Sequence, residues 1–179
     1  MIEMTVDDVL AQHEDELAGE ERVILLREKD GGRLLPIWVG SPEGDALALH
    51  LRHASMLRPL TFDLAARLLE VAGARVERVV ISRLHENVFY ASVAVGSEEV
   101  DARPSDALNL AVRVGAPIYA DKEVLSQAAF PAGNDVGAEL RRKCEETFGP
   151  DAPGGDWQPL TPTGMRGFKA ARGLPASGP

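Results

Sequence analysis

Two parts of the chain repeat one order of elements, and this repetition constrains the fold more than any other feature of the sequence. Residues 45–49 read Asp-Ala-Leu-Ala-Leu, and residues 106–110 read Asp-Ala-Leu-Asn-Leu. Before each motif comes a stretch that predicts a β-hairpin, a proline lies just before the helix, and apolar helical sequence follows. Five residues can match by chance, but a match that shares its flanking hairpin and helix is harder to dismiss. We therefore expect an internal β-hairpin–helix duplication.

The first unit begins with a predicted hairpin over residues 21–40. Apolar residues fill positions 23–26, the sequence "KDGG" supplies turn residues that tolerate positive φ, and "RLLPIWV" is the return strand. Pro36 has no N–H to donate, so part of the return strand should lie at a sheet edge or a bulge. A helix should follow, with Ser41 as its N-cap and Pro42 at the first helical position.

The remaining elements alternate between hairpins and helices. After a helix over residues 61–73, two strands flank the turn "HEN", and a third short strand, "SEEVDA", leads into the helix "PSDALNLAVRVG". A buried strand "APIYA", a short helix "KEVLSQAAF" and an amphipathic helix "DVGAELRRKCEETF" come next. We therefore expect an α+β fold, in which a mixed β-sheet built from hairpins carries helices packed mainly on one face.

The length of the chain allows one domain and a tail, since domains cluster near about 100–150 residues. We expect residues 1–148 to form the domain, with an acidic leader at residues 1–21. From residue 149 glycine and proline dominate without periodicity. Residues 149–179 should therefore be a mostly disordered tail.

The net charge at first argues against a nucleic-acid partner. The chain carries −9, but eight acids lie in residues 1–21 without a lysine or arginine, so residues 22–179 carry only −1. Six arginines within residues 52–83 could form a phosphate-facing patch or lie on solvated faces of a helix and a strand, and we favour the second interpretation. The interleaving of basic and aromatic residues that stacks single-stranded bases is absent.

Several further classes of protein are excluded by simple patterns. The sequence contains neither an apolar run near the about 18 residues of a membrane span nor a signal-peptide pattern, so we expect a cytoplasmic protein. Cys144 is the only cysteine, which rules out an internal disulfide or a zinc framework. His50 and His53 lie three residues apart, but without a third ligand nearby we favour surface or packed residues over a metal pair. No nucleotide-binding or hydrolase motif occurs, and we expect no organic cofactor.

The stretch "VDARPSD" places four polar side chains at the start of the third predicted helix. Pro104 fits the first turn, where Ser105 and Asp106 can cap free N–H groups and meet the positive end of the helix dipole. Capping does not explain Asp101 and Arg103. In the structural interpretation, Arg103 bridges Asp101 and Asp106 in a buried ion-pair network.

The functional interpretation assigns the same groups to phosphodiester cleavage. Asp106, its counterpart Asp45, and Asp63 or Glu43 would converge on Mg²⁺ or Mn²⁺, because such ions take carboxylates, water and substrate phosphate. Arg103 would stabilise the charge that builds on the phosphate. This interpretation requires an open cleft, whereas the structural one requires a sealed network.

Four stretches, "LPIWVGSPEGDALAL", "RPLTFDLAARLLEVAGARVERVVI", "FYASVAV" and "VDARPSDALNLAVRVGAPIYA", resemble in order and spacing the bifunctional nuclease domain family. The resemblance covers roughly residues 20–130, and "DARPSDA" is its most specific part. It implies an α+β domain that self-associates and a nuclease activity on RNA and DNA. The polar pattern of the family falls on Asp63, Asp101, Arg103, Ser105 and Asp106, with the acidic helix-start position on Glu43 or Asp45.

One position departs from the family pattern. Where the family usually has Thr-His-Asp, this chain reads Thr61-Phe62-Asp63, so an imidazole that could act as a base or metal ligand is absent. We expect a nuclease that binds nucleic acid and forms a homo-oligomer, and the alternative is a non-enzymatic oligomeric or regulatory module. The predicted residues are catalytic Asp101, Arg103 and Asp106, substrate-binding Arg103, Ser105 and Arg58, and metal-binding Asp45, Asp63 and Asp106.

Overall fold

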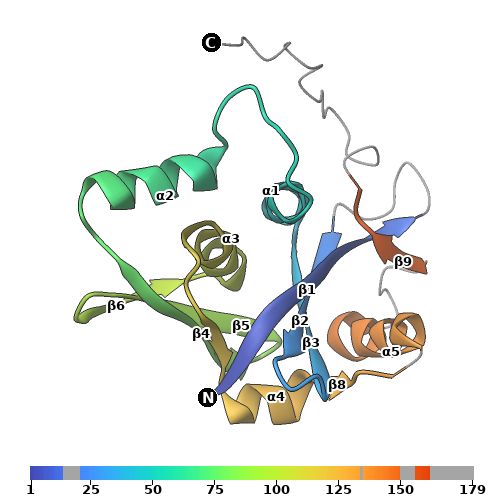
Figure 1. Cartoon of the computed structure of the whole chain (residues 1–179). Helices are drawn as coiled ribbons and strands as arrows, with labels where there is room; N and C mark the ends of the chain where they lie inside the picture. The colour runs from blue at the N-terminus through green and yellow to red at the C-terminus, as the bar shows by residue number, and fades with distance from the viewer. Residues whose placement is uncertain (14–20, 134, 150–155, 162–179) are drawn as a thin grey trace.

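The computed structural model describes residues 1–13, 21–133, 135–149 and 156–161, and in these residues one mixed sheet of nine strands runs through the molecule (Figure 1). The strand order is β6-β5-β4-β7-β1-β2-β3-β8, with β9 beside β1. The predicted α+β fold is confirmed. The strands are β1 (Ile2–His13), β2 (Glu21–Glu28), β3 (Arg33–Gly40), β4 (Val76–His85), β5 (Val88–Val95), β6 (Glu98–Ala102), β7 (Ile118–Ala120), β8 (Phe130–Pro131) and β9 (Asp156–Pro159).

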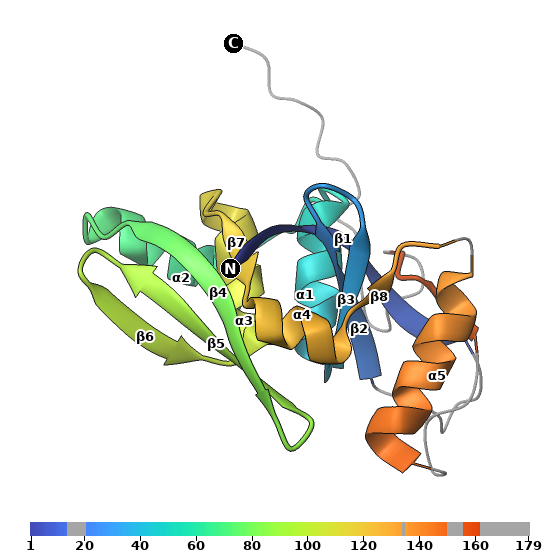
Figure 2. The ribbon, with the colours of Figure 1, turned by 90° about the horizontal axis from the view of Figure 1, so that it is seen from below.

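Five helices are described, and they divide between the two faces of the sheet. They are α1 (Ser41–Leu51), α2 (Thr61–Val71), α3 (Pro104–Val114), α4 (Lys122–Ala128) and α5 (Val136–Phe148). Figures 1 and 2 show α1, α2 and α3 gathered on one side, whereas α5 lies against the other side of the β1–β3 region. Among the described residues, no helix has both the length and the apolar character that a membrane crossing requires.

Strand β2 is buried on both faces, which explains its continuous apolar run. Ile24 and Leu26 belong to the larger core cluster, together with residues of α1 and α3. Val23 and Leu25 point the other way, into a smaller cluster that includes Trp157 of β9 and residues of α5. Alternation along one strand therefore serves two cores, one on each side of the sheet.

The segment described above as an acidic leader contains a central strand. β1 pairs antiparallel with β2 on one side, and with β7 and β9 on the other. The register shifts between Val6 and Asp8, and at this irregularity the adjacent acids are neutralised by ion pairs: Asp7 with Arg27 and Asp8 with Arg52, each at 2.7 Å. The bulge interrupts the apolar alternation, which is why the sequence pattern does not reveal the strand.

The structure differs from the sequence-based expectation at the helix caps and in the tail, and it agrees with the expectation for Pro36. Gly40 and Arg103 occupy the N-cap positions of α1 and α3, and neither helix start has a side-chain capping bond, so Ser41, Ser105 and Asp106 do not act as caps. Part of the expected tail is ordered, because β9 pairs with Leu10–His13 of β1, while residues 150–155 and 162–179 lie outside the described residues. On one side, β3 pairs with β8 only at Arg33 and Leu34, so Pro36 has a strand neighbour only on the β2 side. This is the edge position that was expected for a residue without an N–H.

The two helices that carry the repeated motif lie side by side. α1 follows the β2–β3 hairpin and α3 follows the β5–β6 hairpin, and the two helices are in contact. This arrangement is compatible with the expected duplication, which stays a prediction.

Close packing of α1 on β2 gives the first testable prediction. A Cβ atom at Gly44 would lie 2.5 Å from the Cβ of Arg22, so Gly44→Ala should reduce the free energy of unfolding by about 1–3 kcal/mol through overpacking. Urea denaturation measures this change. Gly137→Ala in α5 is the matched control, since its Cβ would meet nothing closer than 3.7 Å, and it should stabilise the protein by up to about 1 kcal/mol. Equal effects of the two variants would contradict the packing argument.

Candidate functional site

A buried arginine on α3 connects the three helices of the larger core. The side chain of Arg113 is 3% exposed, and its Nε donates to Asp63 Oδ1 of α2 at 2.6 Å. Nη2 donates to the Ala46 carbonyl of α1 at 3.1 Å, and Nη1 donates to both oxygens of Asn109, at 2.9 and 3.0 Å. A buried guanidinium needs such a full set of acceptors to offset its desolvation. Arg113 therefore fixes the positions of α1 and α2 relative to α3.

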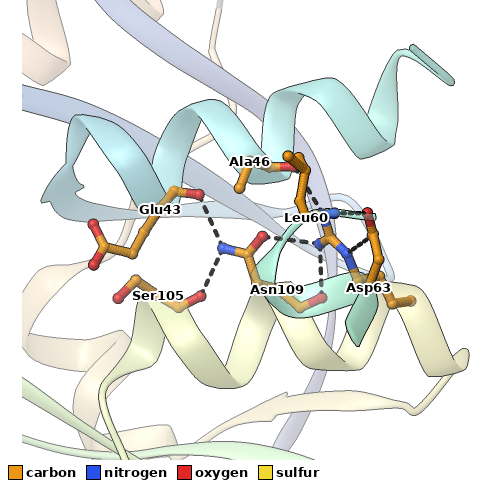
Figure 3. Close-up of polar contacts among 7 residues, drawn as sticks. Glu43, Ala46, Leu60, Asp63, Ser105 and Asn109 are labelled. Atoms are coloured by element: carbon orange, nitrogen blue, oxygen red, sulfur yellow. Dashed lines mark hydrogen bonds and ion pairs between the residues drawn. The ribbon is translucent and has the colours of Figure 1, made fainter. Parts of the chain in front are cut away.

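Asn109 extends this network to the first turns of α1 and α3 (Figure 3). Its side chain is fully buried, and Nδ2 donates to the carbonyl oxygens of Ser105 and Glu43, both at 2.9 Å. The Glu43 backbone is thereby held against the start of α3. By holding this backbone, Asn109 fixes the point from which the Glu43 side chain extends.

Asp63 is an ionised anchor at the start of α2. Its Oδ2 accepts the Leu60 N–H at 2.8 Å, while Oδ1 accepts from Arg113. Burial acts to raise the pKa of Asp63, but the hydrogen bonds from Arg113 and Leu60 and the charge of Arg113 outweigh it, and the pKa is lowered. The carboxylate is therefore committed to the helix junction.

His50 lies in a cavity of about 590 Å³ between α2, α3 and the start of β4, where Asp63 and Arg113 also reach. Its pKa is lowered, first by burial and then by the charge of Arg113. His50 is thus held neutral at physiological pH.

A second hollow, of about 400 Å³, opens between the starts of α1, α2 and α3. Its apolar lining includes Leu49, Leu60 and Phe62. Four charged side chains also line it, and they come from the two repeated helix starts: Glu43, Asp45, Arg103 and Asp106.

Arg103 is the exposed cation of this hollow. It binds Asp106 with two hydrogen bonds, Nε to Oδ2 at 2.7 Å and Nη2 to Oδ1 at 3.0 Å, and Nη2 also donates to Glu43 Oε1 at 2.8 Å. Hydrogen bonds to Asp106 and then to Glu43 raise the pKa of Arg103. The side chain nevertheless remains 66% exposed. The predicted bridge from Arg103 thus joins Asp106 to Glu43 instead of Asp101, and it is open to solvent.

The other predicted site residues lie in different surroundings. Asp45 lines the hollow and pairs with Arg22 at 2.8 Å. Asp101 is exposed on β6 and Arg58 is exposed in the α1–α2 connection, and neither lines the hollow. Ser105 is buried, with 6% exposure, and does not line the hollow.

The three aspartates predicted to bind a metal are not gathered at one point. Asp45, Asp63 and Asp106 each form an ion pair with a different arginine. Within the described ranges, no group of three or more His, Cys, Asp or Glu side chains is arranged to hold a metal ion. Asp106 and Glu43, however, bind the same Nη2 atom of Arg103.

Sequence reasoning missed Asn109 and Arg113. A signal was available, because the repeated motif has Asn109 where its counterpart has Ala48, and Arg113 follows four residues later. Positions four apart share a helix face, so these residues place two polar groups on one side of an apolar helix.

Comparisons with known proteins cover the part of the chain that contains this network and the hollow. A family model described as bifunctional nuclease domain matches residues 24–133. An uncharacterised protein of Mycobacterium tuberculosis is 45% identical over 109 residues, which are 60% of this chain and 66% of that protein. Bifunctional nuclease 1 of Arabidopsis thaliana is 32% identical over 117 residues, 62% of this chain and 36% of the plant protein. Bifunctional nuclease 2 of Oryza sativa subsp. japonica is 32% identical over 109 residues, 56% of this chain and 34% of that protein.

The buried network predicts a large effect of Arg113→Met. This change removes the guanidinium that donates to Asp63 Oδ1 and to the Ala46 carbonyl, and should reduce the free energy of unfolding by about 3 kcal/mol. Breaking a buried ion pair usually costs about 3–5 kcal/mol, and we expect the lower end because the Asp63 side chain is 37% exposed. Urea denaturation tests it, with Arg67→Met on α2 as control, since the Arg67–Glu70 pair is 68% exposed on both sides and should contribute less than about 1 kcal/mol. A loss as small as that of the control would show that the network is not required.

Proposed function

Because the chain belongs to the bifunctional nuclease domain family, we propose that it is a nuclease that hydrolyses phosphodiester bonds of RNA, DNA or both at the hollow between α1 and α3. The family model, which covers residues 24–133, includes all the side chains that line this hollow. The chain spans about two thirds of the mycobacterial relative and about one third of the plant relatives, so activity of the whole plant proteins is carried over only as part of this proposal.

The observation that carries the proposal is the exposed guanidinium of Arg103, which two carboxylates hold at the mouth of the hollow. A guanidinium presents paired N–H donors that match two phosphate oxygens. A phosphodiester that replaces Glu43 on Nη2 leaves the bidentate contact with Asp106 in place. The released Glu43 carboxylate can then accept a proton from the attacking water as the water oxygen bonds to phosphorus, while Arg103 stabilises the charge on the phosphate. The bond from phosphorus to the leaving oxygen breaks, and that oxygen takes a proton from solvent.

A divalent cation is part of the proposal. Glu43 and Asp106 converge on Nη2 of Arg103, at 2.8 and 3.0 Å, so this cation occupies the point between the two carboxylates. Mg²⁺ usually takes one or two carboxylates together with water and substrate phosphate. Once phosphate has displaced Glu43 from Nη2, one oxygen of that carboxylate would hold Mg²⁺ or Mn²⁺ beside Arg103, where the ion would neutralise phosphate charge, and the other oxygen stays free to act as the base. Asp63 is excluded from this role because it anchors Arg113.

Arg103→Ala tests the proposal. Purified protein should cleave labelled RNA or DNA with Mg²⁺ or Mn²⁺, and chelation should abolish cleavage. Removing Arg103 should lower kcat/KM by about 10²–10³-fold, the effect of deleting one donor to a developing oxyanion. The matched control is Arg142→Ala, because Arg142 also binds two carboxylates, Glu139 and Glu146, but lies on α5 outside the matched domain. An unchanged kcat/KM in Arg103→Ala would contradict the role assigned to Arg103.

A second candidate function is a non-enzymatic oligomeric module, and α2 favours it. Leu64, Leu68 and Val71 are 54%, 59% and 74% exposed, which is unusual for three apolar residues on one helix. Arg67 and Glu70 carry opposite charges on the same helix. Two antiparallel copies of α2 could therefore cover the apolar side chains while Arg67 of each approaches Glu70 of the other.

Leu68→Glu tests this contact. If α2 pairs with a second copy, wild-type protein should sediment as an oligomer at micromolar concentrations, and the variant should shift to monomer because a buried charge without a partner is costly. Val88→Glu is the control, since Val88 is 53% exposed on β5 and should leave the oligomer intact. Monomeric wild-type protein, or an equal effect of both variants, would contradict the contact.

A further inference from the structure

We infer that the hollow between α1, α2 and α3 receives one unpaired base of a nucleic acid strand, which stacks on Phe62. The substrate class is therefore single-stranded RNA or DNA. The inference rests on the proposed function, because it names the substrate of the same site.

The shape and lining of the hollow fit a base. Its volume of about 400 Å³ lies in the range of small-ligand pockets, which is about 300–1,000 Å³. Leu49, Leu60 and Phe62 provide apolar and aromatic surface, whereas the charged groups come from the starts of α1 and α3. A base inside a duplex has both faces covered by its neighbours and must leave the stack to enter such a pocket.

Phe62 is held in place as a stacking surface. Its ring centroid lies 5.6 Å from the Cζ of Arg113, whose guanidinium is fixed by the acceptors described above. The next residue, Asp63, is bound to the same guanidinium. Phe62 is partly exposed and lines the hollow. A phenyl ring held in this way can stack any base, because each base has a flat π face.

The charged groups around the hollow favour binding of one base and one phosphate over binding of several consecutive phosphates. Glu43, Asp45 and Asp106 outnumber Arg103 and Arg22, so a highly charged backbone would be repelled. Carboxylates instead accept N–H groups from a base edge, as they do from the amino group of cytosine. Arg103 then binds the single phosphate next to that base.

Fluorescence anisotropy on the full chain tests the inference. The probe is a labelled eight-nucleotide single strand of mixed sequence, measured in chelator and compared with the same strand in a duplex. We expect at least tenfold tighter binding of the single strand. Since one phosphate is contacted, log K should fall with log salt with a slope of about −0.7.

The variants separate stacking from packing. Phe62→Leu keeps an apolar side chain but removes the π face, and should weaken binding at least fivefold because the base–aromatic stack is lost. Phe62→His keeps an aromatic ring and should stay within about threefold of wild type. Val88→Ala, on β5 and outside the hollow, should leave affinity unchanged. Thermal unfolding checks each fold, and Phe62→Met replaces the leucine variant if that one unfolds.

The outcomes distinguish this inference from the proposed function. Unchanged affinity in Phe62→Leu, or equal affinity for duplex and single strand, overturns the inference even if cleavage persists. Binding that depends on Phe62 in a protein that cleaves nothing supports the base site and overturns the nuclease.

Discussion

The ion pair between Arg113 and Asp63 is the interaction on which the rest of the helical layer depends. A guanidinium that is 3% exposed is unfavourable unless its N–H groups are paired, and here the acceptors come from three helices. Satisfying one charge therefore fixes α1, α2 and α3 together. Asn109 then carries the constraint from Arg113 to the backbone of Glu43, at the edge of the hollow. The position of Glu43 at the candidate site therefore depends on Arg113, although Arg113 does not line the hollow.

Arg113 in α3 and Arg103 at its N-cap differ in burial, and this difference separates a structural role from a chemical one. Arg113 is enclosed and each of its three side-chain nitrogens has an acceptor, so exchange of its partners would leave buried polar groups without hydrogen bonds. Arg103 has two carboxylate partners but is 66% exposed, and water can replace either partner at little cost. A side chain that exchanges partners easily can bind a substrate phosphate. This difference in exposure, more than any difference in hydrogen-bond count, makes Arg103 the group around which we place catalysis.

Local sequence patterns predicted most of the elements, because hairpins and amphipathic helices are encoded within about ten residues. The β2–β3 hairpin, α3 and the contact between Arg103 and Asp106 are of this kind. Strand β1 was missed because its bulge interrupts the apolar alternation and its acids find partners on β2 and after α1. Glu43 and Arg103 are 60 residues apart, and Arg113 and Asp63 are 50 apart. Such pairs follow from how the helices pack, which no single segment encodes.

The two repeated motifs show how similar helix starts acquire different roles. Asp45 and Asp106 hold corresponding positions in the sequence, and each lines the hollow with an arginine partner. The partner of Asp45 is Arg22, whose side chain is 14% exposed and lies on β2 against Gly44. The partner of Asp106 is Arg103, which stands at the helix cap in solvent. One half of the hollow is thus fixed by packing and the other is free to exchange ligands. Because only the second half offers an accessible cation, substrate binding should centre on α3, while α1 contributes the carboxylate of Glu43.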